Sequence, residues 1–276
     1  MMSRVNALVL AAGFGTRLKP LTDECPKPLI PVAGVEALFY ALYRISKAGI
    51  KKTIVNSHYK VEQIQQWLDV YRKSFPELDL DLSVEAEILG TGGTILRLLA
   101  ERDLAGGLIT LNGDTLSSLD LRPLVQDCST FSVSYNGEYF KRYNPVYVDG
   151  QGNWAGLDEG VGLRPAHILG AHYLCASDLA WIKKRKEKLR SVGLFEGIYN
   201  LLKEAGRSPK AVEYLPQKTA SDFWFDLTNR DFLSEAKRKL SGEYFPLWKP
   251  VLEKRHPGLA RLEALEYWPL KSSLKS

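Results

Sequence analysis

The sequence is poor in cysteine and has no long apolar run. Its three cysteines, Cys25, Cys128 and Cys175, are an odd number scattered through 276 residues, without CxxC or His-paired spacing. This pattern gives no support to a disulfide framework or a zinc motif and fits a reducing compartment, so we expect a cytoplasmic protein. No stretch approaches the roughly 20 apolar residues that a membrane-spanning helix needs. We therefore expect no membrane partner.

Two common phosphate-binding motifs are also missing. The pattern GxxxxGK[ST] occurs nowhere, and GxGxxG fails because Gly13 and Gly15 are followed by Thr16, Arg17 and Leu18. The chain has a net charge of +5, and most of this excess lies near the C-terminus and not around Gly13 and Gly15. Residues 234–276 hold nine Lys or Arg against five Glu. A basic surface across the main domain is not indicated, so we expect no nucleic-acid partner.

What the sequence does contain is a loop of small residues directly after its first apolar run. The run ends at Leu10, and the next residues with little or no side chain are Ala11, Ala12, Gly13 and Gly15. Such residues let backbone N–H groups approach a ligand closely, as phosphate-binding turns require. Arg17 adds positive charge, and two prolines flank Lys27 and restrict its backbone. The stretch is suited to bind a polyphosphate.

Hydrophobic spacing predicts a βαβα beginning. Residues 36–48 and 61–71 have apolar positions at helical spacing, and residues 52–57 form a β-branched strand between them. Further strands are expected at 80–86, 107–111, 130–135 and 168–175, with a hairpin over 145–157 and helices at 92–101, 178–189 and 194–205. The pattern predicts an α/β fold, a Rossmann-like three-layer αβα arrangement around a mostly parallel mixed sheet.

Two further strand ends carry candidate site residues. Glu85 and the glycine-rich run from Gly90 follow one strand, and Asn112 and Asp114 follow the next. Open α/β sheets bind ligands at the carboxyl ends of their strands. Because Mg²⁺ prefers carboxylate and phosphate oxygens together, Asp114 is a candidate metal ligand.

The pattern LAAGFGTRLKPLT…PKPLIPVAG resembles the N-terminal signature of the sugar-phosphate nucleotidyltransferases. The resemblance implies transfer of a nucleoside monophosphate from an NTP to a sugar 1-phosphate, with Mg²⁺ as cofactor and pyrophosphate as the second product. In this assignment Arg17 and Lys27 are catalytic, and Lys27 also binds the sugar phosphate. Nucleotide contacts are assigned to Leu10, Ala11, Ala12, Gly13, Gly15, Thr16, Arg17, Glu85, Gly90 and Asn112.

The second half of the chain follows the family pattern less closely. The segment Ser221–Leu233 resembles the family's W-x-D segment and places Asp226 as the second metal carboxylate, although the glycine and proline after it are absent. On the sugar side the resemblance assigns Asn144, Glu159 and Gly170 to the sugar phosphate. The lysine that relatives have after this Glu is missing, so Arg164 or another cation would have to replace it.

Which base is bound remains open at this stage. Ionised carboxylates such as Glu85 accept hydrogen bonds, and guanine offers adjacent N–H donors, which favours GTP slightly. The sequence of residues 89–93 is also similar to the corresponding segment of mannose- and heptose-1-phosphate guanylyltransferases. A uridylyl- or cytidylyltransferase is the near alternative. A non-catalytic nucleotide-sugar-binding or regulatory relative is the alternative from a different class.

We expect two regions, a nucleotidyltransferase domain over residues 1–240 and an extension over residues 241–276. The extension is rich in aromatic residues, among them Trp248, Tyr267 and Trp268. A disordered tail rarely carries so many aromatic side chains. We therefore expect it to pack on the domain or on a second copy of the chain in a homo-oligomer.

Overall fold

The computed structural model describes residues 2–32, 34–140, 142–185, 193–214, 222–244, 251 and 254–255. Its main sheet has the strand order β10-β9-β11-β6-β1-β4-β5, and β8 joins it by pairing with β11 and β12. The strands are β1 (Asn6–Leu10), β4 (Lys52–Ser57), β5 (Asp79–Val84), β6 (Leu108–Asn112), β8 (Thr130–Ser134), β9 (Val146–Val148), β10 (Trp154–Gly156), β11 (Arg164–Leu174) and β12 (Lys210–Glu213). Two small sheets pair β2 (Pro31–Val32) with β3 (Val35–Glu36) and β7 (Thr115–Ser117) with β13 (Trp224–Asp226).

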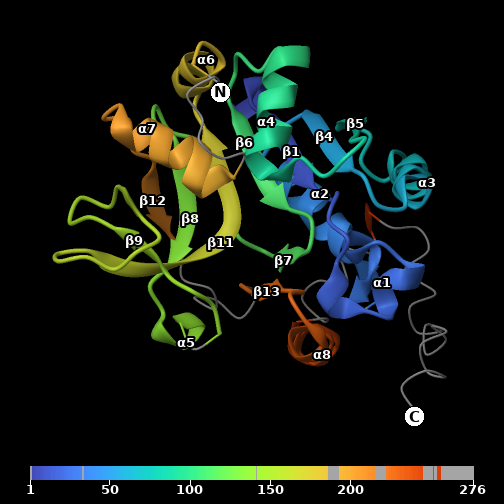
Figure 1. Cartoon of the computed structure of the whole chain (residues 1–276). Coiled ribbons are helices and arrows are strands. Elements are labelled where there is room, and N and C mark those ends of the chain that lie inside the picture. Colours follow the sequence, from blue (N-terminus) through green and yellow to red (C-terminus); the bar gives the residue numbers. More distant parts are fainter. Residues whose placement is uncertain are drawn as a thin grey trace.

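Helices cover both faces of the sheet, as Figure 1 shows with α4 and α7 in front. The α-helices are α1 (Leu21–Glu24), α2 (Ala37–Lys47), α3 (Val61–Tyr71), α4 (Gly90–Glu101), α5 (Gly137–Phe140), α6 (Ala176–Lys183), α7 (Asn200–Glu204) and α8 (Arg230–Lys239). The short 3₁₀ turns are η1 (Met2–Arg4), η2 (Thr16–Leu18), η3 (Lys27–Leu29) and η4 (Arg122–Leu124), and the π-helical segments are η6 (Leu194–Tyr199) and η7 (Leu240–Tyr244).

Strand β1 shows why the sheet carries two hydrophobic cores. Ala7 and Val9 belong to the core under α2 and α3, while Leu8 between them belongs to the core under α4, α6 and α7. Successive side chains of a strand point to opposite faces, so a strand buried on both sides must be apolar throughout. This arrangement confirms the predicted αβα layers.

The sheet is parallel in one half and antiparallel in the other. Strand β1 pairs in parallel with β4 and β6, whereas β11 runs antiparallel to β6, β8 and β9. Strand β11 begins at Arg164, four residues before the strand expected from the sequence. The predicted helix over 194–205 begins as the π-helical η6 and continues as α7.

The predicted extension lies mostly outside the described residues, including Trp248, Tyr267 and Trp268. Its described members contact the domain: Tyr244 is buried against Phe223, and Arg255 pairs with Glu77. The division at residue 240 remains a prediction. In the part of the chain that is described, no helix combines the length and hydropathy needed to cross a bilayer.

Candidate functional site

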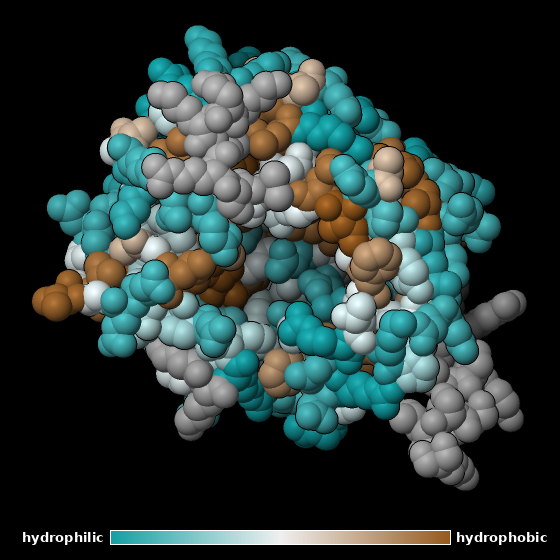
Figure 2. Space-filling view, viewed as in Figure 1, coloured by the Kyte–Doolittle hydropathy of each residue, from teal (hydrophilic) through white to brown (hydrophobic). Residues whose placement is uncertain are grey.

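A cavity of about 370 Å³ opens at the carboxyl ends of β1 and β6. The two strands pair up to Leu10 and Asn112, but the chain continues from β1 toward β4 on one side and from β6 toward β8 and β11 on the other. Such a switch point is where open α/β sheets bind ligands. The cavity is lined by Leu10, Ala11, Gly13, Gly15, Thr16, Arg17, Lys27, Pro28, Asn112, Asp114 and Thr228. Figure 2 shows the hollow near the centre of this face, with hydrophilic residues along its lower rim.

The glycine-rich loop offers unpaired backbone donors to this cavity. Within the described chain, the N–H groups from Ala12 to Arg17 donate to no protein acceptor, whereas the loop oxygens of Gly15 and Thr16 accept from Leu18 and Lys19. A run of free N–H groups beside a cavity is a favourable place for phosphate oxygens. The loop therefore has the donor pattern that the sequence predicts.

Gly15 couples the loop to Lys27. Its φ is +64°, and an added Cβ would lie 2.8 Å from Thr22 Cγ2 and 3.0 Å from Lys27 Cβ. Only glycine combines this backbone conformation with so close an approach. The contact fixes where the Lys27 backbone sits relative to the loop.

A buried network holds the start of the loop. Asn56 Oδ1 accepts from the Ala11 N–H at 2.7 Å, and Asn56 Nδ2 donates to Glu85 Oε1 at 2.9 Å. Glu85 also accepts from the Thr94 hydroxyl and from the Leu89 N–H. Glu85 was expected to read the base. In the structure its carboxylate is bonded to its own chain, which links the two glycine-rich segments through β4.

We expect Asn56→Ala to lower the unfolding free energy by about 1–3 kcal/mol, because it leaves the buried Ala11 N–H without an acceptor and removes one of the donors to the Glu85 carboxylate. The loosened loop should also raise the KM for nucleotide roughly tenfold, a loss of about 1.4 kcal/mol in binding. Urea unfolding and a KM measurement check both effects. The control Gln65→Ala removes an exposed hydrogen bond to Asp69 and should change neither. An unchanged KM in folded Asn56→Ala would contradict the positioning role.

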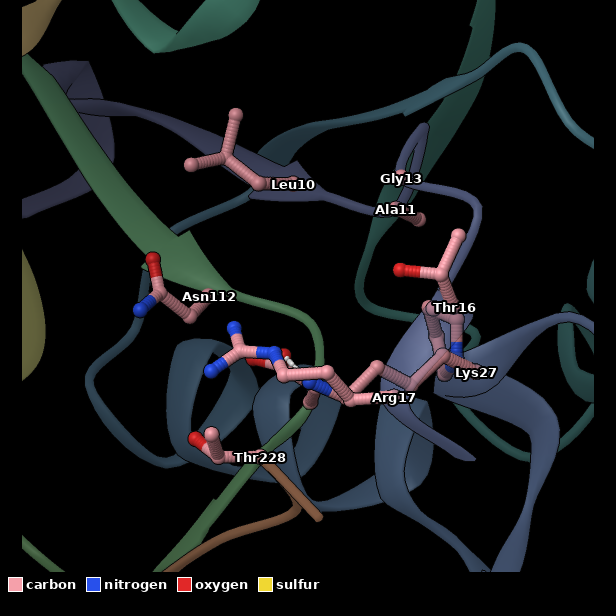
Figure 3. A pocket seen from close by; sticks show the side chains of 11 residues that line it. Leu10, Ala11, Gly13, Thr16, Arg17, Lys27, Asn112 and Thr228 are labelled. Atoms are coloured by element: carbon pink, nitrogen blue, oxygen red, sulfur yellow. Dashed lines mark hydrogen bonds and ion pairs between the residues drawn. The ribbon is translucent and has the colours of Figure 1, made fainter. Parts of the chain in front are cut away.

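Two cationic side chains extend into the cavity. Figure 3 shows Arg17 and Lys27 running alongside each other toward Asn112 and Thr228. Arg17 is exposed on η2, and Lys27 is mostly buried and forms an ion pair with Asp114. Cations beside free backbone N–H groups form a site for an anion with several charges.

The two predicted metal carboxylates, Asp114 and Asp226, meet through the β7–β13 pair. Asp226 lies opposite Thr115, and the N–H of Leu227 donates to the Asp114 carbonyl at 3.1 Å. Burial and the nearby Asp114 carboxylate together raise the pKa of Asp226 to about 6. Residues 112 apart in the sequence are thus neighbours, with Asp114 lining this cavity and Asp226 lining the larger cavity beside it.

These carboxylates fit a divalent cation. Thr228 donates to the Asp226 carboxylate, but Asp226 Oδ1 is buried without a hydrogen-bond partner among the described residues. A buried orphan oxygen beside a second carboxylate is a favourable ligand for a hard cation. No group of three or more His, Cys, Asp or Glu side chains among the described residues could hold a metal by itself. Substrate oxygens would have to complete the coordination.

A second cavity of about 770 Å³ adjoins the first, and Asn112 lines both. Besides Asn112, three other predicted residues line it, namely Asn144, Gly170 and Asp226. Gly170 has φ +74°, and a Cβ there would lie 2.9 Å from Asn112 Nδ2, so the glycine keeps the wall between the cavities thin. Asn144 and Gly170, both predicted for the sugar phosphate, therefore lie together at this cavity.

Some predicted residues are not brought to either cavity. Ala12, Glu85 and Gly90 line neither, although Thr91, next to Gly90, lines the larger one. Glu159 is exposed and lies away from both cavities. The Arg164 guanidinium lies over the Tyr135 ring, 3.5 Å from its centroid, and is no replacement for the missing lysine.

Sequence reasoning missed several lining residues. One of them is Thr228, which could have been predicted because it follows the candidate metal ligand Asp226 by only two positions. His167 packs between the rings of Tyr139 and Tyr143 and against Trp224. The residues of this aromatic cluster come from three segments that are distant in the sequence, so no local sequence pattern predicts it.

His172, which lines the larger cavity, predicts acid sensitivity. It bonds Tyr199 Oη through Nδ1 at 2.9 Å, and burial lowers its pKa to about 3. Because the folded pKa is lowered, the unfolded chain binds a proton on His172 at a higher pH than the folded chain does. The contribution of His172 to the unfolding free energy is therefore fully present above pH 6.5 and is lost as the pH falls toward 3. We expect a loss of about 2 kcal/mol at pH 5 from this residue alone.

Urea unfolding at pH 7 and pH 5 measures this loss. His172→Gln should flatten the pH dependence. An equal slope in His172→Gln would contradict the assignment. His167, whose pKa burial lowers to about 4, keeps part of the dependence.

Comparisons with known proteins agree with this geometry. A family model described as nucleotidyl transferase matches residues 6–135. The chain is 32% identical over 176 residues to the D-glycero-alpha-D-manno-heptose 1-phosphate guanylyltransferase of Campylobacter jejuni, which covers 63% of this chain and 77% of that protein. It is 37% identical over 129 residues to the mannose-1-phosphate guanylyltransferase of Mycobacterium tuberculosis, which covers 44% of this chain but a third (33%) of that longer protein.

The crystal structure of HddC from Yersinia pseudotuberculosis, complexed with GMP-PN, is similar in fold. The TM-score is 0.62 at 21% identity, and the match covers 86% of this chain and 99% of that one. This likeness, together with the mixed sheet, shows that the chain has the predicted α/β fold of the Rossmann-like nucleotide-sugar transferase type.

Proposed function

Because this chain belongs to the sugar-phosphate nucleotidyltransferase family, we propose that it transfers GMP from GTP to a sugar 1-phosphate. The observation that carries the proposal is that Asp114 shares one cavity with the glycine-rich loop, Arg17 and Lys27, and that Asp226 lies next to Asp114. GTP rests on the names of the guanylyltransferase relatives, since the Glu85 carboxylate is bonded within the protein.

The reaction joins two anions in one step. A phosphate oxygen of the sugar 1-phosphate attacks the α-phosphorus of GTP, and the bond from that phosphorus to the β-phosphate bridging oxygen breaks. Pyrophosphate leaves, and the GDP-sugar is the other product. The attacking oxygen is already ionised at neutral pH, so the protein mainly has to align the groups and offset their charge.

The residues divide this task by position. The N–H groups of the loop and the Arg17 guanidinium face the β- and γ-phosphates. Lys27 lies between the loop and Asp114, where its ammonium can contact the α-phosphate and the incoming sugar phosphate. Asp114 and Asp226 would hold Mg²⁺, which would supply positive charge to the phosphates when bound. The larger cavity takes the sugar ring.

Pyrophosphate release from the purified protein tests the proposal. GTP, UTP, CTP and ATP are each offered with Mg²⁺ and with mannose, heptose or glucose 1-phosphate, and the sugar nucleotide is identified by mass. We expect release that needs both substrates and is fastest with GTP. If release occurs with UTP or CTP and a sugar 1-phosphate but not with GTP, the assignment of the base is wrong and the proposed reaction is retained. No release with any pair would overturn the enzymatic function.

A further inference from the structure

Lys27 and Asp114 form the ion pair at the centre of the site. Lys27 Nζ contacts Asp114 Oδ2 directly, and the two side chains are only 13% and 25% exposed. Ion pairs removed from water are screened less than surface pairs, so the contact is a substantial part of the local charge balance. The Asp114 oxygen that faces Lys27 is one of the oxygens that a divalent cation would need.

Lys27 offsets the second carboxylate as well. The charges of Lys27 and Arg17 both act on Asp226, opposing the effects of its burial and of Asp114. Two carboxylates beside one another repel unless a cation lies close to both. Lys27 therefore reduces the repulsion between the two carboxylates, as a bound metal ion would.

The Lys27 side chain can change partners without moving its backbone. The backbone is fixed by Pro26 and Pro28 in η3 and by the close approach of Gly15. The side chain has four rotatable bonds and ends in a compact ammonium, which can exchange a carboxylate for a phosphate oxygen. The free N–H groups of the loop line the same cavity and would hold a substrate phosphate within reach of Lys27.

We propose that Lys27 is a built-in counter-cation that binds Asp114 until a substrate phosphate draws it away, so that the divalent cation enters together with the nucleotide and not before it. This rests on the proposed function, in which Asp114 and Asp226 hold the metal. A single side chain thereby couples phosphate binding to metal binding. The coupling is reciprocal, because each ligand favours the Lys27 position that admits the other.

Titration with Mn²⁺, followed by its electron paramagnetic resonance signal, tests this without turnover. Wild type should bind Mn²⁺ weakly in the absence of nucleotide and at least tenfold more tightly with a non-hydrolysable GTP analogue. Lys27→Gln should bind Mn²⁺ alone at least tenfold more tightly than wild type and gain little from the analogue. Lys19→Gln, on an exposed lysine paired with Asp23, is the matched control and should behave as wild type.

The variant Asp114→Asn identifies the site, because it should abolish the tight Mn²⁺ binding of Lys27→Gln in the double variant. Equal Mn²⁺ affinity of wild type and Lys27→Gln without nucleotide would overturn the exchange, and so would tight binding that survives Asp114→Asn. Failure of the proposed function would show separately, as absence of pyrophosphate release from the wild type.

Discussion

Asp226→Asn is expected to lower kcat/KM for pyrophosphate release by about 10²-fold or more while leaving the chain folded. The reason is that the substitution removes one of the two neighbouring carboxylates proposed to hold the metal but keeps the shape of the side chain. The folded state should even gain stability at pH 7. With its pKa raised to about 6, the ionised Asp226 costs the folded chain free energy above that pH, and Asn removes the cost.

The measurement is a paired one, kinetics and urea unfolding on the same protein. We expect a gain of about 1–3 kcal/mol in unfolding free energy without metal, since one pKa unit corresponds to about 1.4 kcal/mol. The control Asp231→Asn lies in the exposed first turn of α8, five residues away, and should keep its activity. Near-normal turnover in Asp226→Asn would remove this carboxylate from the mechanism.

Arg17→Ala is expected to lower kcat by roughly 10²-fold or more, since cationic side chains at a transferring phosphoryl group contribute 10³–10⁵ in related chemistry. Arg17 is exposed and extends into the cavity from η2, so its removal should leave the unfolding free energy within about 0.5 kcal/mol of wild type. Loss of activity without loss of stability is what distinguishes a substrate contact from a packing role.

Two further variants make the Arg17 experiment specific. Arg17→Lys keeps the charge but not the planar pair of donors, and should recover part of the loss. Lys19→Ala removes a neighbouring surface cation and should have no effect on kcat. Turnover of Arg17→Ala close to that of Lys19→Ala would place the β- and γ-phosphates elsewhere.

The nucleotide side of the site was predictable because its residues follow one another along the chain. Leu10, Gly13, Arg17 and Lys27 lie within one short stretch, and Asn112 and Asp114 end the neighbouring strand. Alternating and helical apolar spacing also predicted the αβα layers. In each of these cases a local pattern determined the position, since parallel strands bring their carboxyl ends to one edge.

The rest depends on distant contacts that a single sequence does not display. Glu85 looked like a base-reading carboxylate, but its partner Asn56 comes from a different strand. Glu159 was assigned from a family pattern, but it lies in the exposed loop between β10 and β11. The three-residue pairing of β7 with β13 determines where Asp226 lies, and no periodicity predicts so short a sheet.

In the proposed reaction the sugar phosphate attacks the α-phosphorus of the nucleotide. The most direct test follows a ³²P label from a known phosphate of GTP into the products. The purified chain is given GTP labelled with ³²P at either the α- or the γ-phosphate, together with a sugar 1-phosphate that it accepts. The account predicts that the α label appears in the sugar nucleotide and the γ label in pyrophosphate. A γ label found on the sugar or in inorganic phosphate would contradict it.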